Sequence, residues 1–279
     1  CLETAANPYV TVLGEKDSAA RRLNLAQSFN GFGWICGPLV GSLLVLGEEG
    51  GSVSLPYAII GVVVLCVAVL FSRVRLPEIE PSADEKTDET ERPLFAYKHF
   101  VFGVVALFFY VAAQTGINSF FINYAVEEVT GLSAKSAGLM LSFGGMGLFV
   151  VGRMVGSWVM RYISAVRLLT LCAVGAVLTM ILVVCRLNAV SMGALFLCYL
   201  FESIMFPTIF VIAIKGVGRH TKRASSYLIM SIVGGAVAPV AMGMIGDRYN
   251  MATGFVIPLF CFVVILAYCI FLRRRCAAE

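Results

Sequence analysis

Long apolar runs follow one another along almost the whole chain. A helix needs about 20 apolar residues to cross the roughly 30 Å hydrocarbon core of a bilayer, and each run reaches about that length. The alternation of apolar and polar residues that would indicate strands is absent from the runs. They predict membrane-spanning helices at residues 24–46, 55–73, 100–126, 136–160, 165–185, 190–214, 224–246 and 252–272. Residues 1–14 have the composition of the second half of another span.

The composition excludes a soluble fold. Apolar residues make up 59% of the chain and charged residues 14%, against about 45–50% and 25% in soluble domains. Too little polar surface is available to cover such a chain in water. We therefore predict an all-α membrane protein that crosses the bilayer several times.

Residues 74–98 interrupt the apolar pattern. They contain three prolines and a dense group of acidic residues, and such a segment cannot bury enough apolar surface to fold alone. We interpret this segment as a cytoplasmic linker between two membrane domains. Residues 1–73 are then the C-terminal part of an incomplete six-helix half, and residues 99–279 are a complete second six-helix half.

Basic residues are distributed unevenly between the two ends of the predicted spans. If the linker is cytoplasmic, 17 of the 21 lysines and arginines lie on that side, three lie on the other side, and Arg153 lies within a span. Basic residues are enriched in cytoplasmic loops of membrane proteins. The charge distribution therefore predicts a cytoplasmic linker and C-terminus and an external loop around Lys135, in a cell (inner or plasma) membrane.

The chain contains a weak internal duplication. Two segments share a glutamate followed by a proline, a short basic loop and a glycine-rich span. The shared spacings are five residues for Glu3–Pro8 and Glu202–Pro207, and 16 residues for Arg22–Pro38 and Arg223–Pro239. Transporters are often built from such repeats. If the second half has six spans, the chain begins within the fourth helix of the first half, with about 8.5 of 12 helices present.

Several stretches resemble the fucose–proton symporter family of the major facilitator superfamily. They are "CLETAANPYVTVLG", "RRLNLAQSFNGFG", "YVAAQTGINSFFINYAVEE", "GRMVGSW" and "FPTIFVIAIKGVGRHTKRASS". The resemblance implies a twelve-helix fold, alternating access, and uptake of a monosaccharide with a proton. It also implies that Glu3 takes part in proton coupling and that Gln27 and Asn30 face the sugar. Asn7, in the same motif as Glu3, is a further candidate for sugar binding.

Glu3 is the acidic residue of the first partial span. It lies 11 residues before Gly14, about 16 Å along a helix, and therefore near the middle of the bilayer. A charge at that depth costs about 2.5–3.5 kcal/mol on insertion scales, so such residues usually face a cavity and have a function. The alternative is a neutral glutamate that is hydrogen-bonded to a neighbouring helix.

Two sets of polar residues recur at helical spacing. Asn24, Gln27 and Asn30, with Trp34 one turn further, would give one helix face amide groups beside an aromatic ring, which suits a sugar. The alternative is interhelical hydrogen bonding, worth about 0.6 kcal/mol per contact, and we assign Asn24 to that role. The second set forms a possible opposite wall of the cavity, or packs within the protein, and comprises Tyr110, Gln114 and Asn118.

The remaining candidates are charged residues and prolines inside spans. We expect Arg153, Pro8 and Pro207 to have structural or gating roles, with Arg153 either snorkelling or capping helix carbonyls. Repeat symmetry directs Glu202 toward the same cavity as Glu3. There it would bind a sugar hydroxyl or tune the proton affinity of Glu3. The alternative is a neutral glutamate bonded to a helix backbone.

Two departures from the fucose pattern leave the sugar open. Asn118 replaces an aromatic residue of the cavity, and Glu202 occupies a position expected to be uncharged. Related glucose/galactose or amino-sugar transporters are therefore alternatives, and "GWICGPLVGS" resembles a motif of proton-coupled drug exporters. A membrane sugar receptor is the alternative outside transport. We expect no enzymatic activity, because no catalytic or metal-binding motif lies in the spans. We also expect a monomer with no cofactor, metal or nucleic-acid partner.

Overall fold

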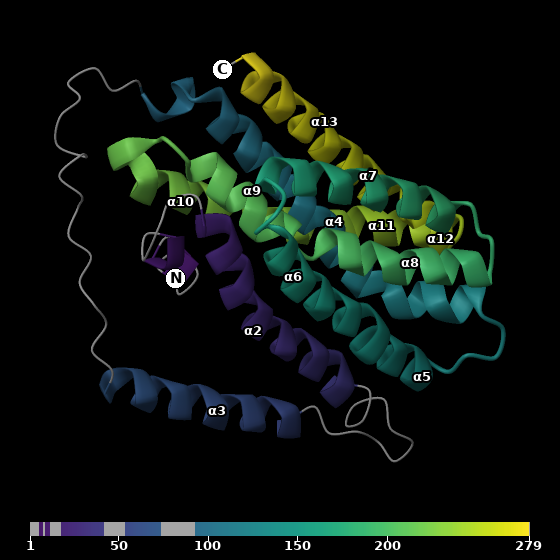
Figure 1. Cartoon of the computed structure of the whole chain (residues 1–279). Coiled ribbons are helices and arrows are strands. Elements are labelled where there is room, and N and C mark those ends of the chain that lie inside the picture. Colours follow the sequence, from purple (N-terminus) through teal and green to yellow (C-terminus); the bar gives the residue numbers. More distant parts are fainter. Residues whose placement is uncertain (1–5, 8, 12–17, 42–53, 74–92, 279) are drawn as a thin grey trace.

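The computed structural model describes residues 6–7, 9–11, 18–41, 54–73 and 93–278, and all regular secondary structure in these ranges is helical. Helix α2 spans Ala19–Val40 and α3 spans Ser54–Arg73. The described side chains of α3 are exposed along its length, and in Figure 1 it lies at the edge of the molecule. The linker predicted at 74–98 lies mostly outside the described residues.

Six helices of the second part of the chain are long and apolar enough to cross a membrane. We call residues 98–274 the six-span bundle. Its elements are α4 (Lys98–Glu128), α5 (Ala134–Leu139), the π-helix Met140–Met146, α6 (Gly147–Val159), α7 (Ala165–Val184), α8 (Ala189–Glu202), α9 (Met205–Ile214), α10 (Thr221–Met230), the 3-10 turn Ser231–Val233, α11 (Gly234–Arg248), α12 (Met251–Gly254) and α13 (Val256–Ala278). The six predicted spans from 100–126 to 252–272 are thereby confirmed.

Successive spans of the bundle run in alternating directions, so that loops gather at its two ends (Figure 1). At one end, Arg186 after α7 contacts Glu128 at the end of α4, with 3.2 Å between Nε and Oε2. The backbone N–H of Met251, at the start of α12, donates to Glu127 over 2.9 Å. At the other end, His99 Nε2 lies 2.9 Å from the carbonyl oxygen of Lys215. The predicted topology requires this alternation, and the assignment of one end to the cytoplasm stays a prediction.

Two predicted spans differ from the structure at a point with a clear local cause. The span predicted at 24–46 begins earlier, at Ala19, because the alanines and arginines before residue 24 are strong helix formers. The guanidinium of Arg22 also donates to the carbonyl oxygen of Thr11 over 2.8 Å, which ties the start of α2 to the preceding helical residues. The span predicted at 190–214 is interrupted at residues 203–204, between α8 and α9.

Pro207 explains this interruption. A proline has no N–H, so Pro207 cannot donate to the carbonyl oxygen of Ser203, four residues earlier. Two side chains from other helices donate to backbone carbonyl oxygens at this break. The hydroxyl of Tyr110 on α4 donates to that of Glu202 over 3.1 Å, and Arg153 Nε on α6 donates to that of Ser203 over 2.9 Å. Neighbouring helices of the bundle therefore stabilise the break.

Candidate functional site

Helix α2 packs directly against the six-span bundle, along α6 and α9 (Figure 1). A Cβ atom added to Gly31 would lie 2.6 Å from Cγ2 of Val150, so glycine permits this close approach. Asn24 is fully buried in the contact, and its amide nitrogen donates to Thr208 Oγ1 on α9 over 3.2 Å. The structure thus places Asn24 in an interhelical contact, as the sequence predicted.

Three of the predicted sugar-binding residues form a hydrogen-bonded chain. Gln27 Nε2 donates to Asn7 Oδ1 over 2.9 Å, and Asn30 Nδ2 donates to Gln27 Oε1 over 3.3 Å. Asn7 is 3% exposed, and its amide nitrogen has no hydrogen-bond partner among the described residues. The chain therefore leads from the protein interior to the exposed side chain of Asn30.

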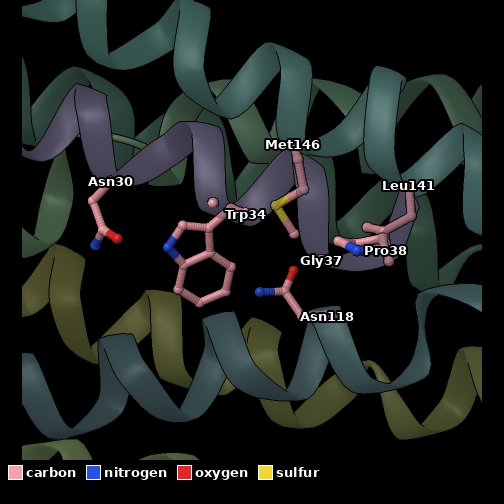
Figure 2. Close-up of a pocket in the computed structure, with 8 residues that line it drawn as sticks. Asn30, Trp34, Gly37, Pro38, Asn118, Leu141 and Met146 are labelled. Carbon is pink, nitrogen blue, oxygen red and sulfur yellow. The ribbon is translucent and has the colours of Figure 1, made fainter. Parts of the chain in front are cut away.

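A cavity of about 360 Å³ lies between α2 and α4, beside the end of this chain. Figure 2 shows Asn30 and Trp34 projecting from α2 toward α4, and Asn118 projecting from α4 toward α2. The Oδ1 atom of Asn118 is buried and has no hydrogen-bond partner among the described residues. The remaining walls of the cavity include Pro38 at the end of α2, and Leu141 and Met146 of the π-helix.

The chemistry of the cavity suits a small molecule that carries several hydroxyl groups. Amide groups offer both donors and acceptors, and the indole of Trp34 offers an apolar face for a sugar ring. Ligand pockets commonly have volumes of about 300–1,000 Å³ with a few polar groups set in apolar walls. The cavity between α2 and α4 has both properties.

The other two residues of the predicted second wall do not line this cavity. Tyr110 is fully buried, and its hydroxyl group accepts a hydrogen bond from Gln114 Nε2 over 2.8 Å. Successive residues at a spacing of four drift by about 40° around a helix of 3.6 residues per turn. Tyr110 therefore faces the break between α8 and α9, while Asn118, two steps further on, faces the cavity.

Arg153 connects α2 to the bundle from a buried position. It is 4% exposed, so it caps carbonyls rather than snorkelling, and the structure thereby decides between the two alternatives. Its NH1 atom donates to the backbone oxygen of Gln27 over 2.6 Å, and its Nε atom donates to that of Ser203. The guanidinium carbon also lies 4.6 Å from the centre of the Phe149 ring. No pattern in the sequence indicated this role for Phe149.

Glu202 ends α8 and is completely buried. Neither of its carboxyl oxygens has a hydrogen-bond partner among the described residues. It does not line the cavity between α2 and α4. Glu3 and Pro8 lie outside the described residues, so the predicted meeting of the two glutamates remains a prediction.

The π-helix Met140–Met146 is a feature of the site that the sequence analysis missed. It places Leu141 and Met146 at the cavity wall, while Ser142 donates to the carbonyl oxygen of Ile35 on α2 over 2.7 Å. Short π-helical segments inside α-helices are frequent at functional sites. The paired glycines Gly144 and Gly145 are the only local sign of an irregular helix in that stretch.

Comparisons with known proteins agree with this architecture. The model of the Major Facilitator Superfamily matches residues 1–232. A glucose/galactose transporter of Brucella abortus is 34% identical over 276 residues, which cover 96% of this chain and 67% of the relative. An L-fucose-proton symporter of Escherichia coli is 36% identical over 299 residues, covering 96% of this chain and 68% of the relative.

A solved structure also resembles the whole described arrangement. The crystal structure of the transporter FucP in the outward conformation matches with a TM-score of 0.80 and 35% identity, over 97% of this chain and 72% of that one. A multi-pass helical architecture, a matching family model and these relatives point to one conclusion. The chain belongs to the Major Facilitator Superfamily, in the family that includes these fucose and glucose/galactose transporters.

Proposed function

We propose that this protein carries a monosaccharide into the cell together with a proton, by alternating access. The observation that supports it best is the cavity between α2 and α4, where Asn30, Trp34 and Asn118 offer amide groups and an aromatic face. The relatives named as an L-fucose-proton symporter and a glucose/galactose transporter favour the same substrate class. In this proposal the linker and the C-terminus are cytoplasmic, the protein lies in the inner or plasma membrane, and it works as a monomer.

Gln27 and Asn30 have the central part in sugar binding. The two amides are bonded to each other, and that of Gln27 is also bonded to Asn7, which fixes their orientation before a sugar arrives. Preorganised polar groups lower the entropy cost of binding. Asn118 lines the opposite wall of the cavity, and its side-chain amide binds the sugar from there.

Uptake of labelled sugars by the full-length carrier in liposomes tests this proposal. We expect accumulation of at least one sugar among L-fucose, D-galactose, D-glucose and N-acetylglucosamine when the outside is made acidic. An uncoupler that dissipates the proton gradient should abolish accumulation and leave only equilibration. Failure to bind or accumulate any of these sugars would contradict the proposal, and accumulation that survives the uncoupler would contradict proton coupling.

Glu3 is the proposed proton-coupling residue, on the strength of the family resemblance and of its depth in the predicted span. Glu3→Gln should abolish proton-driven accumulation and spare exchange of labelled for unlabelled sugar, because glutamine keeps the hydrogen bond but cannot titrate. Parallel assays of accumulation and exchange measure the two properties. Proton entry that still follows sugar addition in this variant would assign coupling to another residue.

A further inference from the structure

The carboxyl group of Glu202 is a buried acid that neither the cavity nor the resemblance explains. It is 0% exposed, and both of its oxygens lack hydrogen-bond partners among the described residues. An ionised carboxylate without partners is very costly in an apolar interior, and such a group takes up a proton instead. Glu202 is therefore neutral in the conformation that the structure describes.

One cation and three weak acids lie around this residue. Arg153 on α6 is anchored next to it, because its Nε atom donates to the carbonyl oxygen of the adjacent Ser203. Tyr110 reaches the backbone of Glu202 from α4, and Cys198 and Tyr199 lie one turn earlier on α8. Tyr110 is occupied by its bonds to Gln114 and to the Glu202 backbone. Arg153 is therefore the group through which a change of conformation can alter the charge of Glu202.

The guanidinium of Arg153 is shared between α2 and the six-span bundle. Its NH1 atom donates to the backbone oxygen of Gln27 on α2 over 2.6 Å, and Nε donates to that of Ser203 over 2.9 Å. Ser203 directly follows Glu202 in the chain, so the guanidinium already lies at the break that contains the glutamate. Alternating access moves the two halves of a transporter relative to each other. The bond between Arg153 and Gln27 joins α2 to the six-span bundle, so this motion can break it.

We propose that Glu202 is a second proton site of the carrier, switched by Arg153. When α2 moves away from α6, NH1 of Arg153 loses the carbonyl of Gln27 and turns to the Glu202 carboxyl group. The O–H bond of the carboxyl group breaks, its proton passes to water, and the resulting carboxylate pairs with the guanidinium. The return of α2 restores the Gln27 bond, and Glu202 takes up a proton again.

This switch links the sugar to the proton through adjacent contacts. Asn30 lines the cavity and donates to the side chain of Gln27, whose backbone oxygen accepts from Arg153, so Gln27 lies between the sugar-contacting residue and Arg153. The inference rests on the proposed sugar–proton transport, and it adds a titrating group in the second half of the protein to the one proposed at Glu3. A buried guanidinium that loses a partner without gaining another is costly. When Arg153 loses the carbonyl oxygen of Gln27, the carboxylate of Glu202 becomes its new partner.

Infrared difference spectroscopy of the full-length carrier in lipid tests the switch directly, because a protonated carboxyl group has a carbonyl band distinct from that of a carboxylate. L-fucose and D-galactose are the probes. We expect sugar addition to remove a protonated-carboxyl band in the wild type and in Glu127→Gln, a matched change at the exposed rim. The band should be absent in Glu202→Gln, which should also take up fewer protons per sugar in a pH-indicator assay.

Glu202→Asp keeps a titratable group on a shorter side chain, and it should shift the band rather than remove it, which covers the case where Glu202→Gln does not fold. A band that persists unchanged in Glu202→Gln or Glu202→Asp overturns the switch. If the wild type binds and accumulates sugar with no change in a carboxyl band assigned to Glu202, the switch fails while the transport proposal stands. If the wild type binds neither of these sugars in calorimetry, nor D-glucose or N-acetylglucosamine, both proposals fail.

Discussion

Helix α2 and the paired helices α10 and α11 follow the same plan with different surfaces. Each has an arginine in its first turns and a proline 16 residues later, at Pro38 inside α2 and Pro239 inside α11. Counted from the arginine, Asn24, Gln27, Asn30 and Trp34 of α2 correspond to Ser225, Leu228, Ser231 and Gly235. The amides and the indole of one helix are thus replaced by small or apolar residues in the other.

This difference in side chains corresponds to a difference in how closely α2 and α11 pack against α4. A Cβ atom added to Gly235 would lie 2.7 Å from Thr115 Oγ1 on α4, so α11 packs against α4 with no room between them. At the corresponding place Trp34 lines the cavity that separates α2 from α4. The repeat therefore sets the path of both helices, and the side chains decide which of them borders a binding cavity.

Giving α2 the surface of α10 should have the largest effect. Gln27→Leu introduces the residue found at the corresponding Leu228, and it removes the partner of both Asn7 and Asn30. Buried polar groups left unpaired cost about 1–3 kcal/mol, so sugar affinity should fall by about 10- to 100-fold. Binding of labelled sugar to purified protein measures the loss. Affinity within twofold of the wild type would show that the amides are interhelical contacts and not ligands.

The packing side of the comparison predicts a smaller effect, on stability. Gly235→Ala forces a methyl group against Thr115, and overpacking of this kind typically costs about 1–3 kcal/mol. Gly33→Ala in α2 is the matched control, because a Cβ atom at Gly33 meets no atom within 4 Å. Thermal unfolding in detergent should show a lower midpoint for Gly235→Ala alone. Equal midpoints for the two variants would mean that α11 and α4 separate more easily than the described contact allows.

The smallest effect is expected at Ser231, the counterpart of Asn30. Its hydroxyl group donates to the carbonyl oxygen of Leu228 in its own helix and does not line the cavity. Ser231→Ala should leave sugar affinity unchanged within about 0.5 kcal/mol, the usual range for changes away from special features. The same binding assay applies. A loss comparable to that of Gln27→Leu would indicate that both helices contribute equally to the site.

The positions of the spans could be predicted from the sequence, whereas most partners within the site could not. Gln27 and Asn30 were predicted as one face and are hydrogen-bonded to each other. Asn118 was predicted together with Tyr110 and Gln114, but only Asn118 lines the described cavity. Residues spaced by four positions point in gradually different directions around a helix. Which of them faces the cavity depends on how α4 packs against its neighbours.

Arg153 is the clearest case of a role that needed tertiary structure. The sequence allowed it to snorkel or to cap carbonyls, and its partners Gln27 and Ser203 lie 126 and 50 residues away along the chain. The local cause of one contact was visible beforehand, since Pro207 leaves the Ser203 carbonyl without its helical donor. Nothing in the sequence indicated that α6 would supply that donor.

The sequence by itself determined that the chain is helical, where the spans of the bundle lie and that they alternate in direction. These properties depend on the length, hydropathy and charge of each segment in relation to a bilayer, and need no knowledge of its neighbours. Only the tertiary structure decided that Asn30, Trp34 and Asn118 border one cavity and that Arg153 lies between Gln27 and the break beside Glu202. Those relations depend on how each helix is rotated and how closely it packs, which distant residues fix together.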